Sequence, residues 1–148
     1  MTTLEIVHRD PSSYTCTLER VQHRFTRITG GFSSLLYAKR LLRLALWPVE
    51  ERRYRCDLIE VFKMFYGYTE IDKRVLFTLD GNDKGLCGHS KKICKPRLNT
   101  DIRKYFFSNR VIDRWNSVGQ DTVHAPSLNC FKNRLTKIRC TRLGFFVD

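Results

Sequence analysis

The chain has 148 residues, of which 42% are hydrophobic and 28% are charged, and its formal net charge is +12 at pH 7. This composition excludes a disordered tail, and no apolar run approaches the ~20 residues that a membrane-spanning helix needs. The N-terminal residues lack the apolar block of a signal peptide, so the expectation is an intracellular protein, nuclear or cytoplasmic, whose six cysteines are reduced.

Residues 17–31 predict an amphipathic helix. Its apolar side chains recur at spacings of three, four and three with arginines outside this stripe, and Gly30 ends the helix. A second, shorter helix follows, capped by Ser33 or Ser34. The apolar stripe of the first helix is Leu18, Val21, Phe25 and Ile28, and the side chains expected to face inward from the second are Leu35, Ala38, Leu41, Leu42 and Ala45.

A third helix is predicted between Pro48, which suits the first helical position, and Gly67. From residue 68 to residue 98 the helical periodicity fails. In that stretch the letters VLFTLD suggest a short extended piece, GNDKGLCGHS a loop, and KKICKPR an extended, basic and exposed segment. The apolar stripe of the third helix is Tyr54, Leu58, Val61, Phe62 and Phe65.

Helical periodicity returns in the last third of the chain. Residues 110–118 favour a helix, and a final helix begins at a Ser127 cap, whereas residues 102–109 fit a strand or a helix. Phe106 and Trp115 are assigned to the core, because large aromatic side chains at helical spacing usually lie there. The inward faces of the two predicted helices are Val111, Trp115 and Val118, and Leu128, Phe131, Leu135 and Ile138.

These elements predict a mainly α protein, a small helical domain of about five helices in two lobes. An N-terminal helical lobe occupies residues 1–67, and a basic helical lobe occupies residues 99–148. An extended, glycine-containing basic loop, residues 68–98, joins them, with one short β pairing left open.

The positive charge is concentrated in the second part of the chain. Residues 1–83 hold 13 Lys and Arg against 11 Asp and Glu, whereas residues 84–148 hold 14 against 4. This asymmetry favours a polyanion such as RNA or DNA, bound through its phosphates. A membrane is not expected, because no amphipathic helix carries an undivided basic face. The predicted contacts are Lys91, Lys92, Lys95, Arg97, Arg103, Lys104 and Arg110.

Catalytic patterns are absent from the sequence. There is no GxxxxGK[ST], HExxH or GxSxG motif, and no two aspartates are adjacent. We therefore expect no enzymatic activity from this chain alone and no cofactor. Cys87, His89 and Cys94 raise the question of zinc, but structural zinc sites usually combine two clusters of paired ligands, and packed or free cysteines are the simpler interpretation.

Five blocks in a fixed order carry a family resemblance: LERVQHRFTRITGGFSSLLYAKRLLRLAL, RRYRCDLIEVFKMFYG, GHSKKICKPR, DIRKYFFSNRVIDRWNSV and APSLNCFKNRL. Together they resemble the region that follows the polymerase domain in the endonuclease–reverse transcriptase of non-LTR (LINE or jockey-like) retrotransposons. The similarity runs from about Leu18 to Leu135. The chain departs from the family at Val118-Gly119, where Leu-Pro is usual, and at Cys56, where a small residue is common.

The resemblance implies a parent RNA-directed DNA polymerase with an N-terminal endonuclease and a right-hand polymerase. Residues 1–67 would then be thumb-like or post-polymerase helices, and this chain would be a nucleic-acid-binding accessory region without the palm aspartates. A structural alternative is a module that packs against the polymerase domain through an exposed apolar face of its first or second helix. A further alternative is a non-functional, 5′-truncated copy. Oligomeric state and RNA or DNA preference stay open.

Overall fold

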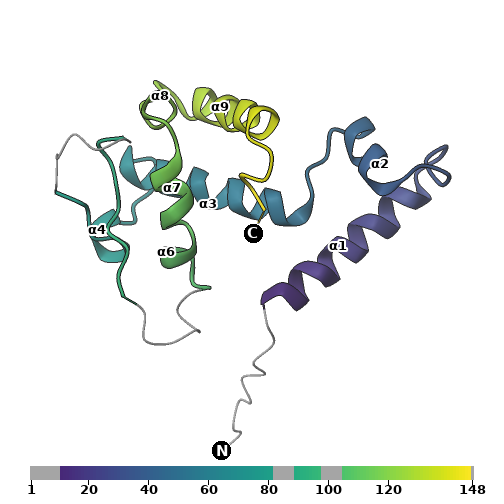
Figure 1. Cartoon of the computed structure of the whole chain (residues 1–148), viewed down its shortest axis with the longest axis horizontal. Coiled ribbons are helices and arrows are strands. Elements are labelled where there is room, and N and C mark those ends of the chain that lie inside the picture. The colour runs from purple at the N-terminus through teal and green to yellow at the C-terminus, as the bar shows by residue number, and fades with distance from the viewer. Residues whose placement is uncertain (1–10, 82–88, 98–104, 148) are drawn as a thin grey trace, which may run out of the picture. The chain divides into compact units, whose positions relative to one another are not determined.

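The structure is a computed structural model that describes residues 11–81, 89–97 and 105–147, with side chains described from Cys16 onward. It is mainly helical, as predicted (Figure 1). The longer helices are α1 (Pro11–Ile28), α2 (Tyr37–Arg43), α3 (Val49–Phe65) and α9 (Leu128–Thr141). The shorter ones are α4 (Lys73–Leu76), α6 (Phe107–Arg110), α7 (Ile112–Ser117) and α8 (Gln120–Val123).

The chain forms two compact units, unit 1 (Met1–Arg52) and unit 2 (Arg53–Asp148). The division falls inside α3, earlier than the predicted connection at residues 68–98. The reason lies in the side chains of α3: its apolar stripe packs against aromatic residues that follow much later in the sequence. The phenyl rings of Phe62 and Phe131 lie 4.3 Å apart, and the rings of Phe65 and Trp115 lie 5.3 Å apart.

In unit 1, α1 contacts α2 through polar side chains. The Glu19 carboxylate accepts hydrogen bonds from the Tyr37 hydroxyl and from the backbone N–H of Val49 at 2.7 Å. Val49 is the first residue of α3, so this carboxylate supplies both a hydrogen-bond acceptor and a negative charge at a helix N-terminus. Gln22 donates to the Trp47 carbonyl at 3.0 Å, and Thr26 is fully buried.

The second helix is shorter than its sequence predicts. It begins at Tyr37, and Leu36 in the cap position makes no side-chain hydrogen bond, so neither serine caps it. Of the five side chains expected to face inward, Leu41 is buried and Leu35 is half-buried, whereas Ala38, Leu42 and Ala45 are exposed, so the prediction was wrong for these three.

The end of α2 is closed by backbone hydrogen bonds. The N–H of Leu46 donates to the Leu41 carbonyl at 2.9 Å, and the N–H of Ala45 donates to the Leu42 carbonyl at 3.2 Å. These two bonds define a Schellman motif, whose closing residue adopts a left-handed conformation. Here that residue is Ala45, with φ 51°. At the end of α3 the corresponding residue is Gly67, with φ 71°, as predicted.

Unit 2 has an aromatic core. Trp115 and Phe131 are fully buried, and the Phe62 ring also stacks on Tyr66 at 4.3 Å. The predicted inward faces of α7 and α9 are confirmed at Val111, Trp115, Val118, Phe131 and Leu135. The Ser127 hydroxyl accepts a hydrogen bond from the N–H of Cys130, which confirms the predicted cap of α9.

Two further predictions are resolved within the described residues of unit 2. An isolated antiparallel bridge pairs Leu79 with Ile93, which is the one short β pairing that the sequence left open. The prediction that Phe106 belongs to the core was wrong, because its side chain is 56% exposed and precedes α6 as its N-cap residue.

Candidate nucleic-acid interface

The predicted basic segment, residues 91–97, is called the basic strip below; it begins in a turn at Lys91 and continues as non-helical chain with an isolated bridge at Ile93. Residues 78–80 pair with one of its edges: the N–H of Cys94 donates to the Thr78 carbonyl at 2.8 Å, and the N–H of Asp80 donates to the Lys92 carbonyl at 3.0 Å. Ile93, at the centre of the strip, is 2% exposed. The strip is therefore anchored at Ile93, with Lys92 next to this buried residue and Lys91 and Lys95 two residues away on either side.

Helix α7 holds the basic strip through side chains. The Asn116 amide accepts from the N–H of Ile93 at 2.9 Å and donates to the carbonyl of Ile93 at 2.8 Å. The indole N–H of Trp115 donates to the Lys91 carbonyl at 2.8 Å. These bonds satisfy backbone groups that a neighbouring strand would otherwise pair.

His89 and Ser90 immediately precede the strip, and hydrogen bonds hold both residues in place. His89 is 3% exposed, its Nδ1 accepts from the N–H of Lys91 at 3.2 Å, and its Nε2–H therefore donates to the Trp115 carbonyl at 2.8 Å. Burial lowers the pKa of His89 from 6.5, and the charges of Lys92, His124 and Lys91 act in the same direction. The Ser90 N–H donates to the side-chain oxygen of Gln120 at 3.0 Å.

The predicted cations of the strip differ in their surroundings. The Lys91 ammonium lies 3.6 Å from the centre of the Tyr66 ring, and Lys92 is half-buried. The Lys95 ammonium pairs with the Asp113 carboxylate at 2.5 Å, and both side chains are more than half exposed. Arg97 is exposed, and its side chain makes no hydrogen bond or ion pair with another described residue. Exposed cations meet a phosphate at little desolvation cost.

The structure places Arg110 in a different setting from the strip. Its guanidinium forms a bidentate pair with the Asp57 carboxylate of α3, at 2.7 and 2.8 Å. The side chains of Arg110 and Asp57 are 22% and 10% exposed. A bidentate pair at this burial acts in folding first, because removing one partner leaves an uncompensated charge. Arg103 and Lys104 lie outside the described residues.

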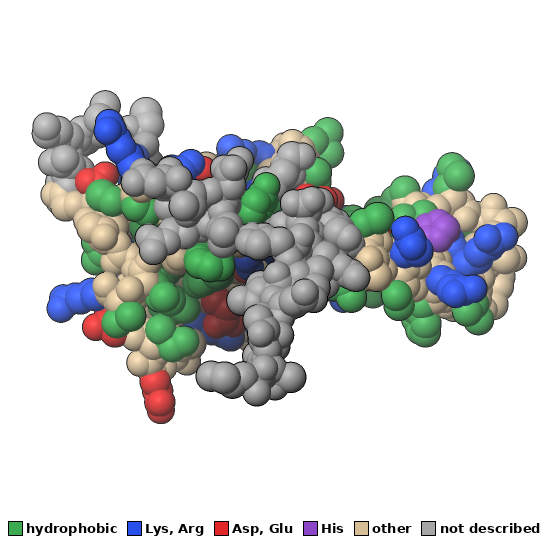
Figure 2. Space-filling view, turned by 90° about the horizontal axis from the view of Figure 1, so that it is seen from below, with side chains coloured by type: hydrophobic (Ala, Val, Ile, Leu, Met, Phe, Trp, Pro, Cys, Tyr) green, Lys and Arg blue, Asp and Glu red, His purple; other side chains and the backbone are tan. Residues whose placement is uncertain are grey.

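A second basic surface lies on α1. Arg20, Arg24 and Arg27 are exposed at helical spacings of four and three. Figure 2 shows Lys and Arg side chains beside hydrophobic ones on the face of unit 1 turned to the viewer. The apolar stripe of α1, defined as Leu18, Val21, Phe25 and Ile28, is 57 to 78% exposed. The sequence predicted the stripe but left open whether it faces the core or is exposed.

Metal ligands do not gather in the described parts of the chain. Both ring nitrogens of His89 are engaged, Cys94 is exposed, and Cys87 lies outside the described residues. No group of three or more His, Cys, Asp or Glu side chains forms a cluster among the residues that the structure covers. No helix in the same ranges is long and apolar enough to cross a membrane.

Two features thus mark the surface of the described chain: a fixed extended strip with exposed cations in unit 2, and a helix with exposed arginines and apolar side chains in unit 1. Comparison of this chain with family models, with curated proteins and with solved structures found no match.

Proposed function

We propose that this chain binds RNA or DNA without sequence specificity, as an accessory region of a non-LTR retrotransposon reverse transcriptase. The observation that carries the proposal is the basic strip, whose backbone is hydrogen-bonded on both edges at residues 92–94 while the Lys95 and Arg97 side chains are exposed. Fixing the backbone before binding reduces the entropy lost when the cations meet phosphates. The resemblance to the retrotransposon region supplies the biological setting.

The charge of residues 84–148, the C-terminal part of unit 2, supports the same proposal. Residues 84–148 carry 14 Lys and Arg against 4 Asp and Glu, and two of those acids, Asp113 and Asp121, are in the described ranges. The exposed Lys95–Asp113 pair contributes about 0–1 kcal/mol, so a phosphate can displace or share it. Binding of this kind positions nucleic acid and reads no bases.

The salt dependence of binding tests this proposal. Affinity for a labelled 20-nucleotide RNA is measured against salt concentration for the full chain and for Lys95→Gln/Arg97→Gln. Two lost phosphate contacts should lower the slope of log K against log salt by about 1.4 on a single strand. Lys39→Gln/Arg43→Gln on α2 removes the same charge from exposed positions elsewhere and serves as the matched control. Undetectable binding at low salt, or an equal effect of both double variants, would contradict the proposal.

A second candidate function follows from α1. Its apolar stripe is exposed, and the adjacent polar face of the helix makes the contacts within unit 1. A contiguous exposed apolar face commonly marks a protein interface. The chain would then pack against the polymerase domain, with Arg20, Arg24 and Arg27 beside the contact.

Substitution of the stripe separates the two functions. Val21→Gln/Phe25→Gln should abolish binding to the polymerase domain encoded upstream and leave RNA affinity unchanged, while the free energy of unfolding changes by less than about 0.5 kcal/mol because both side chains are exposed. Leu143→Gln, at an exposed position of unit 2, is the control. If the polymerase domain binds the double variant as well as the native chain, α1 has no packing role.

A further inference from the structure

Two neighbouring aromatic side chains face water just before α6. Tyr105 is 47% exposed and Phe106 is 56% exposed, whereas Phe107, the next residue, contacts Phe77 at 6.0 Å between ring centres. Phe106 has an extended backbone, so Tyr105 and Phe106 project in different directions from the chain. Neither ring is used in the aromatic core around Trp115, so folding does not explain why large rings occupy these positions.

The backbone that carries the two rings is firmly held. The Phe106 carbonyl accepts hydrogen bonds from the N–H groups of Asn109 and Arg110, both at 3.0 Å. The Arg110 guanidinium donates to the Tyr105 carbonyl at 3.0 Å while it pairs with Asp57. The ion pair therefore ties this turn to α3, and the exposed rings rest on a fixed support. Because the backbone is already held, stacking of a planar ligand on a ring has only side-chain torsions to order.

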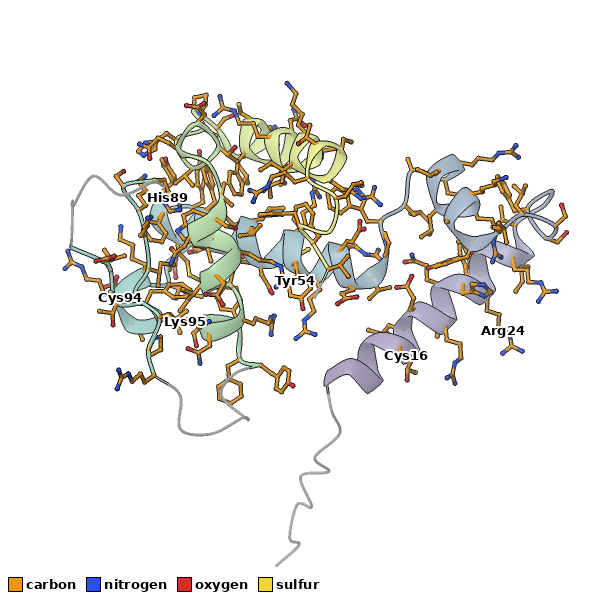
Figure 3. All side chains as sticks on the ribbon, in the orientation of Figure 1. Cys16, Arg24, Tyr54, His89, Cys94 and Lys95 are labelled. Atoms are coloured by element: carbon orange, nitrogen blue, oxygen red, sulfur yellow. The ribbon has the colours of Figure 1, made fainter. Side chains whose placement is uncertain are left out.

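The basic strip runs toward these rings. The strip is hydrogen-bonded to Trp115 at Lys91 and to Asn116 at Ile93, and Lys95 pairs with Asp113, so the strip reaches the N-terminal part of α7 at Lys95. Figure 3 labels His89 before the strip and Cys94 and Lys95 within it. Arg97 lies two residues beyond Lys95, and Tyr105 and Phe106 directly precede α6. Phe107 of α6 contacts Phe77, and Thr78, the residue after Phe77, accepts a hydrogen bond from the N–H of Cys94, so α6 and the exposed rings before it lie at the Lys95 end of the strip.

We propose that Tyr105 and Phe106 stack on the bases of single-stranded nucleic acid whose phosphates follow Lys95 and Arg97. The inference rests on the proposed function and adds the strandedness of the ligand. Stacking on a protein ring requires an unpaired base with an open face, which a duplex does not offer away from its ends. Phosphate neutralisation combined with aromatic stacking is the usual chemistry of single-strand binding.

The test compares single strands with duplexes. The full chain is titrated with a labelled 20-nucleotide single strand, as RNA and as DNA, and with a duplex of the same length. The native chain should bind both single strands more tightly than the duplex. Phe106→Ala should weaken single-strand binding roughly 10-fold and leave duplex binding and the salt slope unchanged, since base stacking has that order of effect.

Two conservative variants show whether the aromatic face is what matters. Phe106→Tyr should retain single-strand affinity, and Phe106→Leu, which keeps an apolar side chain without an aromatic face, should lose most of what Phe106→Ala loses. Ultraviolet crosslinking of the RNA, mapped by mass spectrometry, should place adducts on Tyr105 or Phe106 in the native chain. This readout is independent of any effect on folding.

The outcomes separate the inference from the proposed function. If the native chain binds single strands and duplex equally, with normal salt dependence and no effect of the Phe106 variants, the stacking site is refuted and phosphate binding stands. If single-strand affinity is retained in Phe106→Leu, apolar bulk and not stacking is responsible, which also refutes the inference. If no nucleic acid binds at low salt, the proposed function fails and the stacking site with it.

Discussion

Asn116 shows how one side chain can stand in for a strand. Its amide both accepts from and donates to the backbone of Ile93, at 2.9 and 2.8 Å. A strand neighbour would satisfy the same two groups, so the amide closes the edge of the basic strip that residues 78–80 leave unpaired. The sequence predicted an extended, basic segment, but nothing in its letters indicates that an asparagine 23 residues later pairs with it.

His89 makes the stability of unit 2 depend on pH. The unfolded chain binds a proton at this side chain near pH 6.5, whereas the buried, folded side chain binds it only at lower pH. Below pH 6.5 the unfolded state therefore holds more protons, and the free energy of unfolding falls as the pH falls. We expect a lower urea midpoint at about pH 5 than at about pH 7.5.

A histidine substitution isolates this effect. In His89→Gln the amide can still donate to the Trp115 carbonyl without titrating, so the decline in urea midpoint between the two pH values should be smaller. Leu143→Gln, at an exposed position of unit 2, is the control and should keep the native decline. An unchanged decline in His89→Gln would mean that other groups control the pH dependence.

At the scale of elements, the helices were more predictable than the directions in which they face. The spacing of apolar residues identifies α1, α3 and α9 because each is long enough to show the period. The face that α1 turns inward depends on Tyr37, Trp47 and Val49, which bind Glu19 and Gln22 across 18 to 30 residues of sequence. These polar partners cannot be identified from the hydrophobicity pattern of α1.

The end of α2 provides a stability prediction. Ala45 adopts φ 51°, a left-handed conformation that costs a residue with a Cβ about 1 kcal/mol and costs glycine almost nothing. Ala45→Gly should therefore raise the free energy of unfolding of unit 1 by about 1 kcal/mol, measured by urea denaturation. Ala38→Gly, inside the same helix at an exposed position, should lower it by a similar amount. A destabilising Ala45→Gly would show that α2 ends differently.

At the scale of the whole molecule, the two units differ in how much they bury. Among the described residues, unit 1 buries Thr26, Arg40 and Leu41, and the other buried side chains belong to unit 2. Because apolar burial is the main source of stability, unit 1 should open at a lower free energy. The fold class was predictable from sequence. The difference in stability between the two units was not, because the spacing of the apolar residues in α1 is the same for a buried stripe as for an exposed one.

Hydrogen exchange measures directly the difference in opening free energy between unit 1 and unit 2. Amide hydrogens in α1 and α2 should exchange faster than those in the central turns of α3 and α9, because local opening exposes them more often. Peptide-level mass spectrometry of the full chain resolves these helices. Equal protection of α2 and α9 would mean that unit 1 draws stability from contacts of another kind.

The outward stripe of α1 also bears on how this sequence can vary. Leu18, Val21, Phe25 and Ile28 contribute little to folding, because water already surrounds much of each side chain. Selection for a stable fold therefore leaves these four positions nearly free to drift, while it restrains Glu19 and Gln22 on the adjacent face of the helix. Among descendants of this sequence, persistence of apolar residues at the four positions would record the demands of a binding partner and not of the fold.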